Sequence, residues 1–282
     1  MGTSVVLLGT GTPRTELGRA GAATAIVVDG ATYLFDFGPG VGRRISRAHQ
    51  SGIVGMALRS ITRAFLTHHH SDHTSGLPDL HLTSWMLHRD SALKVYGPQG
   101  TRAMCTHIVA AYTLDVAKRT LNEPHTEHGH KLEGHDIVPG LVYEDDRVKI
   151  EAFDVPHGVW ATVHGPHPTL GYRITTADRS IVISGDTTYH EEMTNRYRAA
   201  DVVVHEVYSS RGLAARPPPW QEYHRHAHTA AADLGRVASA AEPEMVVLTH
   251  QLLWDAQPQD IMDEITQTYD GPVTYGTDLL VI

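Results

Sequence analysis

The chain has 282 residues, of which 41% are hydrophobic, so it can bury a substantial core, and its length suits one α/β domain spanning residues 1–282. Its formal net charge of -9 argues against broad, sequence-independent binding to the phosphates of nucleic acids. The single cysteine, Cys105, excludes an intrachain disulfide and a thiolate metal cluster, which fits a reducing compartment. Residues 1–10 lack the features of a signal peptide, and no apolar run approaches the length of a membrane span. We therefore expect a cytoplasmic protein without membrane contact.

The elements expected along the chain alternate between strands and helices. Short runs rich in β-branched residues predict strands at residues 4–8, 24–28, 32–36, 64–67, 149–155, 170–175, 180–184, 202–206 and 245–249. Apolar residues at helical spacing predict helices at residues 77–88, 100–117, 191–200, 229–241 and 258–269. This mixture predicts an α/β fold. Residues 118–147 and 208–226 lack periodicity, and we expect loop insertions there, either lids over a binding site or disordered surface segments.

The strongest functional signal is the segment His-His-His-Ser-Asp-His at residues 68–73, which directly follows an apolar predicted strand. In extended backbone, His68 and His70 point to the same side, because side chains alternate. The turn that follows can bring Asp72 and His73 to a second centre. Imidazole and carboxylate ligands suit zinc, and iron or manganese would accept the same ligands. The segment therefore predicts ligands for two adjacent metal ions.

An alternative interpretation treats the same segment as the start of a helix. In that case Ser71 or Asp72 caps a helix over residues 74–88, and the histidines are polar loop residues. Capping and metal binding are compatible, but four potential ligands within six residues are hard to explain by capping alone.

The segment at residues 68–73 resembles the His-x-His-x-Asp-His signature of the metallo-β-lactamase superfamily, and the resemblance covers nearly the whole chain. Three later segments resemble the parts of that family that deliver its remaining metal ligands: FDVPH at 153–157, SIVISGDT at 180–187 and VVLTH at 246–250. The resemblance implies a four-layer αββα sandwich built from two similar halves. A Leu-Thr-His step shared by residues 66–68 and 248–250 indicates the same duplication, or is a chance similarity between buried strands.

The resemblance also implies a set of metal ligands. One ion would be bound by His68, His70, His157 and Asp186, and the other by Asp72, His73, His250 and the same Asp186. Taken alone, each of the three later residues has an ordinary structural interpretation, but their joint occurrence in this order favours ligation. The expected cofactors are two Zn²⁺ per chain, with Mn²⁺ or Fe²⁺ as alternatives.

Within the superfamily the chain is most similar to the ribonuclease Z branch. The segments that carry this similarity are LGTGTP at 8–13, VVVHE at 202–206 and HTAAA at 228–232. The similarity implies that Glu206 and His228 handle protons during catalysis, and the alternative is a buried structural hydrogen bond. His224 and His226 lie close by in sequence, but only His228 directly precedes the predicted helix start.

Two departures from that branch weaken the case for tRNA processing. In ribonuclease Z a long arm that grips the tRNA elbow lies between the strands corresponding to residues 170–174 and 181–186, which here are joined by a turn. The segment DFGPGVGRR at 36–44 stands where the branch usually has Gly-Glu-Gly-Thr-Gln. Arg43 and Arg44 of this segment either meet an anionic substrate or form a solvated charge pair on a helix.

The leading functional hypothesis is hydrolysis of a phosphodiester or related ester by a hydroxide that bridges two metal ions. Asp72 would orient the nucleophile, and His228, held by Glu206, would protonate the leaving oxygen. The alternatives are a tRNA 3′-processing endoribonuclease, an arylsulfatase, a lactonase or lactamase, and a metal-binding scaffold without activity. The expected partner is a small-molecule ester substrate, nucleic acid is disfavoured, and a homodimer is expected because relatives often dimerise.

Overall fold

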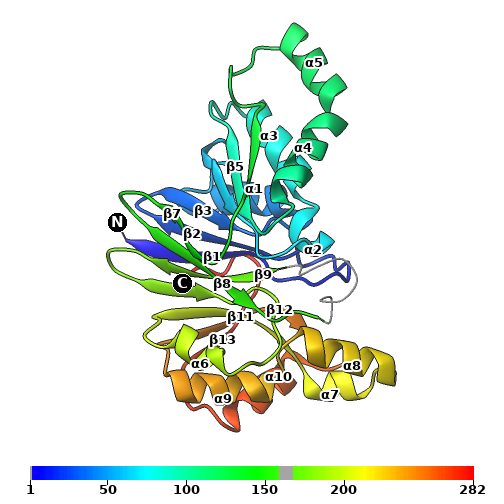
Figure 1. The fold of residues 1–282 in the computed structure, drawn as a ribbon, viewed down its shortest axis with the longest axis vertical. Coiled ribbons are helices and arrows are strands. Elements are labelled where there is room, and N and C mark those ends of the chain that lie inside the picture. The colour runs from blue at the N-terminus through cyan, green and yellow to red at the C-terminus, as the bar shows by residue number, and fades with distance from the viewer. Residues whose placement is uncertain (1, 159–167) are drawn as a thin grey trace. The chain divides into compact units, whose positions relative to one another are not determined.

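The computed structural model describes residues 2–158 and 168–282 (Figure 1). The chain divides into two compact units, one formed by Met1–Val138 with Asp278–Ile282 and the other by Pro139–Thr277. We call them unit 1 and unit 2. Each unit contains one mixed β-sheet and the helices that connect its strands.

The sheet of unit 1 contains six strands in the order β1-β2-β3-β4-β5-β6. The first three pair antiparallel, whereas β3 to β6 pair in parallel. The strand bounds are β1 (Thr3–Gly9), β2 (Ala23–Val28), β3 (Ala31–Phe35), β4 (Arg63–Phe65), β5 (Leu93–Gly97) and β6 (Leu132–Asp136). Helical crossovers join the parallel strands, as parallel pairing requires.

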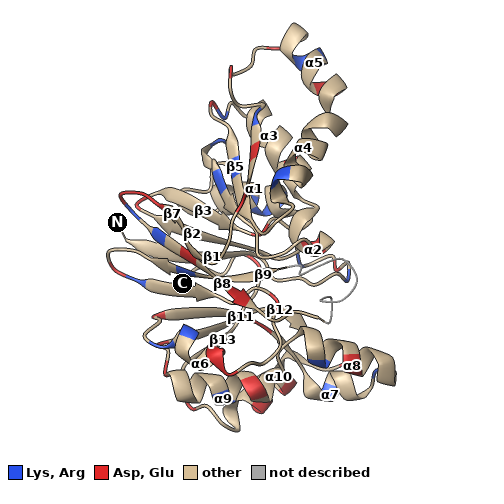
Figure 2. Cartoon of the chain, in the orientation of Figure 1, with Lys and Arg blue, Asp and Glu red and all other residues tan. Residues whose placement is uncertain are grey.

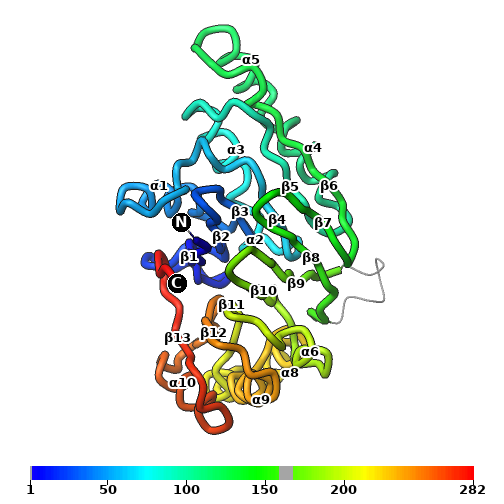
Figure 3. The backbone as a smooth tube through the Cα atoms, turned by 90° about the vertical axis from the view of Figure 1, so that its left-hand side faces the viewer, coloured from blue at the N-terminus to red at the C-terminus, as the bar shows by residue number. Residues whose placement is uncertain are grey.

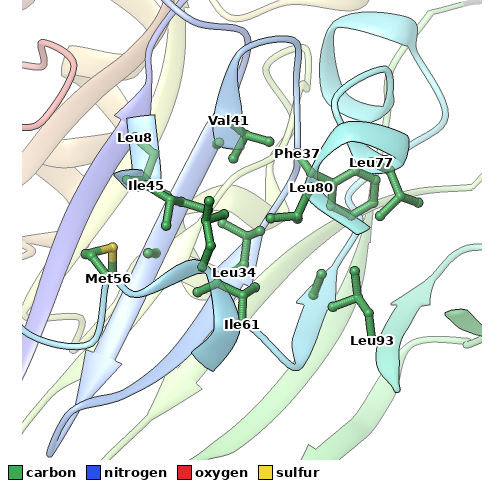
Figure 4. Packing of buried hydrophobic residues seen from close by; sticks show 14 of the residues in the cluster. Leu8, Leu34, Phe37, Val41, Ile45, Met56, Ile61, Leu77, Leu80 and Leu93 are labelled. Carbon is green, nitrogen blue, oxygen red and sulfur yellow. The ribbon is translucent and has the colours of Figure 1, made fainter. Parts of the chain in front are cut away.

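The helices of unit 1 lie in these crossovers. Their bounds are α1 (Val41–Gln50), the 3₁₀ helix η1 (Leu58–Ser60), α2 (Ser71–Thr74), α3 (Leu77–Met86), α4 (Thr101–Ala111) and α5 (Thr113–Asn122). On α1, Val41, Ile45 and Ala48 occupy one buried face. Figure 4 shows Val41 and Ile45 packed among the side chains of the core, beside Leu34 of β3. Because burying one such side chain contributes about 1.5–3 kcal/mol, this packing holds the segment between β3 and α1 in place.

The two ends of the chain meet within unit 1. Val5 of β1 donates its backbone N–H to the carbonyl of Ile282 at 2.9 Å, and Leu7 donates to Leu280 at 3.0 Å. The N and C labels accordingly lie close together in Figure 3. Residues 278–282 are therefore an integral part of unit 1.

The sheet of unit 2 contains seven strands in the order β13-β12-β11-β10-β9-β8-β7. The strand bounds are β7 (Gly140–Glu144), β8 (Lys149–Val155), β9 (Thr169–Thr175), β10 (Ser180–Ile183), β11 (Val202–Tyr208), β12 (Val246–Leu252) and β13 (Val273–Tyr275). The helix bounds are α6 (Glu192–Tyr197), α7 (Ser210–Ala214), α8 (Pro218–Ala227), α9 (Ala231–Ala241) and α10 (Pro258–Thr266). Apolar side chains of α9 and α10, including Leu234 and Ile261, pack with Val207 and Leu248 of the sheet.

The same pattern of strands occurs in both units. In unit 2, β8, β9 and β10 pair antiparallel, and β10 to β13 pair in parallel, which repeats the arrangement of β1 to β6. The prediction of two similar halves is confirmed at this level. The shared Leu-Thr-His step does not mark equivalent positions, however, because β4 corresponds to β11 in this pattern, whereas residues 248–250 belong to β12.

The prediction that residues 118–147 and 208–226 lack secondary structure is wrong. The first segment contains the end of α5, β6 and β7, and the second contains α7 and most of α8. β6 lies at the edge of its sheet and is only partly buried, so its sequence shows no apolar alternation. The prolines before α8 suggested a loop, but proline is tolerated in the first turn of a helix, and α8 begins at Pro218. A role for these segments as lids stays a prediction.

Four strands were not predicted at all: β5, β6, β7 and β13. The predicted helix over residues 100–117 is instead two helices, α4 and α5, which are separated at Tyr112. Among the described residues, none of the helices combines the length and the apolar character needed to cross a membrane.

Candidate active site

The four potential ligands predicted in unit 1 lie together just after β4. His68, Asp72 and His73 are buried, and His70 is partly buried. The His68 Nε2 and His70 Nδ1 atoms are 3.0 Å apart, and His73 Nε2 lies 3.6 Å from an Asp72 oxygen. These separations bring ring nitrogens and a carboxylate oxygen together in pairs, as is typical of side chains that share a cation.

The capping interpretation of this segment is wrong. α2 begins at Ser71 itself and its N-cap is His70, whose backbone is extended. α3 follows after Gly76, and neither helix has a side-chain hydrogen bond at its N-cap. The Thr74 hydroxyl donates to the His70 carbonyl at 2.9 Å, which closes the short turn that carries Asp72. The segment thus forms a tight turn of its own.

Asp36, which sequence analysis did not assign to the site, organises the unit 1 ligands. It directly follows β3 and is buried. Its Oδ2 atom accepts hydrogen bonds from His73 Nδ1 at 2.7 Å and from the Thr67 hydroxyl at 2.9 Å, and Oδ1 accepts from the Thr67 backbone N–H at 2.8 Å. Since Thr67 donates its hydroxyl proton to Asp36, its oxygen can accept from His68 Nδ1, 2.9 Å away. Both rings are therefore held with Nε2 as the nitrogen that can bind a metal.

We expect Asp36→Asn to weaken zinc binding about 10- to 100-fold, the range found when the hydrogen-bond partner of a ligating histidine is lost. The amide has only one acceptor atom and cannot replace both carboxylate oxygens. Competition against a chromophoric chelator measures the affinity. Asp29→Asn is the matched control, because Asp29 is exposed and its φ of 48° is one that asparagine tolerates. An unchanged affinity in a folded Asp36→Asn protein would refute the assigned role.

A glycine in the same segment permits close backbone packing beside Asp72. A Cβ atom added to Gly38 would lie 2.1 Å from the Asp72 carbonyl oxygen and 2.5 Å from the carbonyl carbon of Gly21. Only glycine therefore fits at position 38. Gly38, which lies in the segment that departs from the ribonuclease Z pattern, thus lets the backbone pack closely beside Asp72.

Unit 2 brings together the other predicted ligands. His157 follows β8, Asp186 follows β10, and His250 lies within β12. Asp186, His228 and His250 each offer one ligand atom, and these atoms lie within 4.8 Å of one another. His157 and Asp186 satisfy the same limit as a pair. The carbonyl of Ala227 accepts from His157 Nδ1 at 2.6 Å, so the His157 lone pair is on Nε2.

A bulge in β12 positions His250. The pairing of β11 with β12 passes from Glu206–Thr249 to Val207–Gln251 and leaves out His250, whose φ is 43°. The Gln251 side-chain amide donates to the carbonyls of Leu248 at 2.8 Å and Gly276 at 2.9 Å. Gln251, a residue that sequence analysis did not select, therefore stabilises the backbone that presents His250.

Glu206 and His228 lie next to each other in the buried interior of unit 2. His228 Nδ1 is 3.3 Å from Glu206 Oε2 and 3.9 Å from Asp186 Oδ2. The other carboxylate oxygen, Glu206 Oε1, accepts from the backbone N–H groups of Thr187 at 3.2 Å and Thr229 at 3.0 Å. The carboxylate is thus anchored to the backbone and directed at the His228 ring.

The environment of Glu206 favours a bound proton. Burial, and next the negative charge of Asp186, raise the pKa of Glu206 well above its usual value, while His250 and the two backbone donors act in the opposite direction. We expect burial to dominate because the side chain is almost fully enclosed. Glu206 therefore releases a proton less readily than an exposed glutamate does.

The neighbouring histidines have different surroundings. His226 is exposed, and its Nδ1 lies 2.8 Å from the Glu222 carbonyl oxygen within α8. His224 is buried, and its ring packs against Trp254 with centroids 4.8 Å apart. Burial lowers the pKa of His224 to about 4. Of the three, only His228 faces Glu206 and Asp186.

His205 precedes Glu206 on β11 and is completely buried, so burial lowers its pKa to about 4. In the unfolded chain a histidine takes up a proton near pH 6.5, whereas the folded protein resists protonation until much lower pH. The stability that this residue contributes is therefore present above pH 6.5 and is lost as the pH falls toward 4. Because of the lowered pKa of His205, we expect the free energy of unfolding to be about 2 kcal/mol lower at pH 5 than at pH 7.

Urea unfolding in the presence of a chelator measures this effect. The difference in stability between pH 7 and pH 5 should shrink in His205→Gln, and should stay unchanged in the control His226→Ala, whose side chain is exposed. An identical pH dependence in wild type and His205→Gln would show that His205 does not resist protonation.

The fold and the clusters of histidine and carboxylate ligands define a metal-dependent hydrolase. Residues 31–251 match the family model described as the beta-lactamase superfamily domain. The chain therefore belongs to the beta-lactamase superfamily.

Relatives and solved structures agree with this classification. Ribonuclease Z of Mycobacterium sp. (strain KMS) is 28% identical over 279 residues, which cover 98% of this chain and 94% of that protein. The metallo-beta-lactamase fold protein YhfI from Bacillus subtilis aligns with a TM-score of 0.73 and 17% identity, covering 99% of this chain and 98% of that chain. Human tRNase Z, short form, aligns with a TM-score of 0.72 and 22% identity at the same coverage. The predicted metallo-β-lactamase fold is confirmed.

Proposed function

We propose that the chain is a dinuclear zinc hydrolase that cleaves a phosphodiester or a related ester. The proposed ligands of one ion are His68, His70, His157 and Asp186, and those of the other are Asp72, His73, His250 and Asp186. The donor set supports this assignment, because imidazole nitrogens and carboxylates without thiolates suit zinc in a hydrolytic site. Hydrogen bonds that direct Nε2 of His68, His73 and His157 outward give further support.

The observation that carries the proposal is the buried Glu206–His228 pair beside Asp186. A scaffold that merely stores metal has no need of a buried carboxylate–imidazole pair next to a ligand. A thiolate leaves readily without a proton, whereas an alkoxide leaving group benefits from a proton donor. The pair therefore favours phosphodiester or ester hydrolysis over thioester hydrolysis.

Zinc ions bound to these ligands would act as Lewis acids and lower the pKa of water. The chain's own residues do the rest. Asp72 is positioned by α2 to orient the nucleophile, and Asp36 keeps the neighbouring His73 ring in place. Glu206 Oε2 lies 3.3 Å from Nδ1 of His228, so the opposite nitrogen of the ring would be left to deliver a proton to the leaving oxygen.

Metal analysis and a substrate panel test this proposal. Protein purified without chelator should contain two zinc ions per chain and hydrolyse bis(p-nitrophenyl) phosphate faster than an aryl sulfate, a lactone or a β-lactam. Activity should be lost on dialysis against a chelator and return with zinc. Faster turnover of the sulfate, lactone or β-lactam would redirect the proposal to that class, and metallated protein inactive on the whole panel would indicate a binding scaffold.

A second candidate, a tRNA 3′-processing endoribonuclease, is supported by the similarity to ribonuclease Z along nearly the whole chain. The connection between β9 and β10 is a four-residue turn, residues 176–179, closed by a hydrogen bond from Thr176 N–H to Arg179 O at 2.8 Å. An arm of the kind that grips tRNA is thus not inserted at this point. Cleavage of a precursor tRNA at rates above those for the small diester would favour this candidate, and gel filtration of the same sample tests the expected homodimer.

A further inference from the structure

Unit 1 contains a pocket that lies directly beside one of the proposed metal ligands. Its volume is about 550 Å³, and it is lined by the segment from Thr12 to Gly21, the start of α1, and Ser71, Asp72 and Ser75. This volume falls within the range of about 300–1,000 Å³ that is usual for small-molecule sites. Because Asp72 forms part of the wall, a molecule bound in the pocket would lie beside one proposed metal ligand.

Four arginines line this pocket, Arg14, Arg19, Arg43 and Arg44, together with only two acids, Glu16 and Asp72. This is unusual in a chain with a net charge of -9, whose acidic residues include those of α9 and α10 in Figure 2. A local group of arginines on an otherwise acidic chain is a specific feature that overall charge does not account for.

Two of the arginines are already engaged in structural contacts. Arg44 Nε lies 2.8 Å from Asp278 Oδ2, and its guanidinium also donates to the Gly18 carbonyl at 2.6 Å. Arg19 pairs with Glu16 at 3.5 Å and donates to Thr10. These contacts tie the segment between β1 and β2 to α1 and shape the wall of the pocket.

Arg14 and Arg43 have a different status. Both side chains are exposed, and within the described residues neither forms an ion pair. They line the same pocket from two elements far apart in sequence, the segment after β1 and the first turn of α1. Arginine guanidinium groups bind phosphate oxygens through parallel hydrogen bonds, so two of them form a suitable receptor for a phosphate.

We propose that Arg14 and Arg43 bind a second phosphate group of the substrate, separate from the phosphodiester that is hydrolysed. The pocket then takes the part of the molecule that carries this phosphate, and Pro13 and the fully exposed Leu17 offer apolar contacts to its organic portion. This inference rests on the proposed function. It narrows the substrate class to small phosphodiesters that bear an additional terminal phosphate, of the size of a nucleoside bisphosphate.

Two substrates that differ by one phosphate test this inference. They are the p-nitrophenyl ester of thymidine 5′-phosphate and the same ester with a 3′-phosphate. The wild-type enzyme should have a lower KM for the 3′-phosphorylated ester, and Arg43→Ala should raise that KM about tenfold, the expected loss of one charge-assisted hydrogen bond. The KM for the ester without the 3′-phosphate should stay unchanged. Arg14→Ala should act in the same way.

Arg47→Ala is the matched control, because Arg47 lies one turn further along α1, is exposed, and does not line the pocket. Equal KM values for the two esters in the wild type, or equal effects of Arg43→Ala and Arg47→Ala, would overturn the inference.

A binding measurement separates this inference from the proposed function. Calorimetric titration of the protein with thymidine 3′,5′-bisphosphate should show affinity that is weakened about tenfold in Arg43→Ala and retained in Arg47→Ala. If neither ester is hydrolysed but this difference is observed, the proposed function fails and the phosphate site stands. If both esters are hydrolysed and the difference is missing, the phosphate site fails and the proposed function stands.

Discussion

His228→Ala is expected to lower kcat by about 10²- to 10⁴-fold while the zinc content stays at the wild-type level, because a positioned proton donor contributes a factor of that size. His228 Nδ1 lies 3.3 Å from Glu206 Oε2. The imidazole can therefore be held by the carboxylate through Nδ1 and transfer a proton from its other nitrogen.

The alternative role for His228 is that of a metal ligand, since it also offers a ligand atom within 4.8 Å of those of Asp186 and His250. The two roles predict different results. If His228 is a proton donor, the His228→Ala protein should bind zinc as the wild type does. If His228 is a metal ligand, the same variant should lose zinc. Metal analysis and steady-state kinetics on one preparation therefore decide between them, and a parallel loss of zinc and activity contradicts the proton-donor assignment.

His226→Ala serves as the control, because His226 is exposed at the end of the same helix. It should retain wild-type turnover. Glu206→Gln provides a second variant that keeps the size of the side chain. Since a neutral amide cannot stabilise a protonated His228, its loss of activity should depend on pH and be smallest at low pH, where protonation of the ring is easier.

Asp186→Ala is expected to reduce hydrolysis by about 10³-fold or more and to bring the zinc content below two ions per chain. Asp186 is the one residue proposed as a ligand of both ions, and metal ions in such sites supply several kcal/mol of transition-state stabilisation. Removal of Asp186 should therefore lower the rate of hydrolysis more than removal of any residue that binds only one of the two ions.

The stability of metal-free protein distinguishes this prediction from simple misfolding. The negative charge of Asp186 is one cause of the raised pKa of Glu206, so its removal relieves a repulsion between two buried carboxylates. Chelator-treated Asp186→Ala should unfold at the same temperature as chelator-treated wild type or above it. Asp178→Ala, in the exposed turn between β9 and β10, is the control and should keep both zinc and activity. A lower unfolding temperature for metal-free Asp186→Ala would assign Asp186 a structural role.

Local sequence predicted most of the elements that carry ligands. The strands before His68 and Asp186 and the strand that contains Glu206 are largely buried and apolar. Such strands can be recognised in a sequence because burial on both faces demands a continuous hydrophobic run. The edge strands β6 and β7 escaped prediction for the opposite reason, since an edge strand exposed to solvent carries no apolar pattern.

The supporting residues of the site could not be selected from sequence. Asp36 is the last residue of a predicted strand and the first of the segment that departs from the ribonuclease Z pattern, and Gln251 follows His250 as an ordinary polar residue. Their roles depend on hydrogen bonds to residues that are far away in the chain, His73 in one case and Gly276 in the other. One signal was available for Asp36, because it directly follows a buried strand in the same manner as the residues that lead to Asp186.

The sequence by itself determined the type and order of the candidate ligands, and with them the superfamily, because the chemistry of metal binding restricts each position to very few residue types. Tertiary structure alone decided which side chains hold those ligands and which arginines share a pocket with Asp72. Hydrogen bonds and shared cavities join residues that are distant along the chain, and a local sequence pattern does not indicate which distant residues lie close together in space.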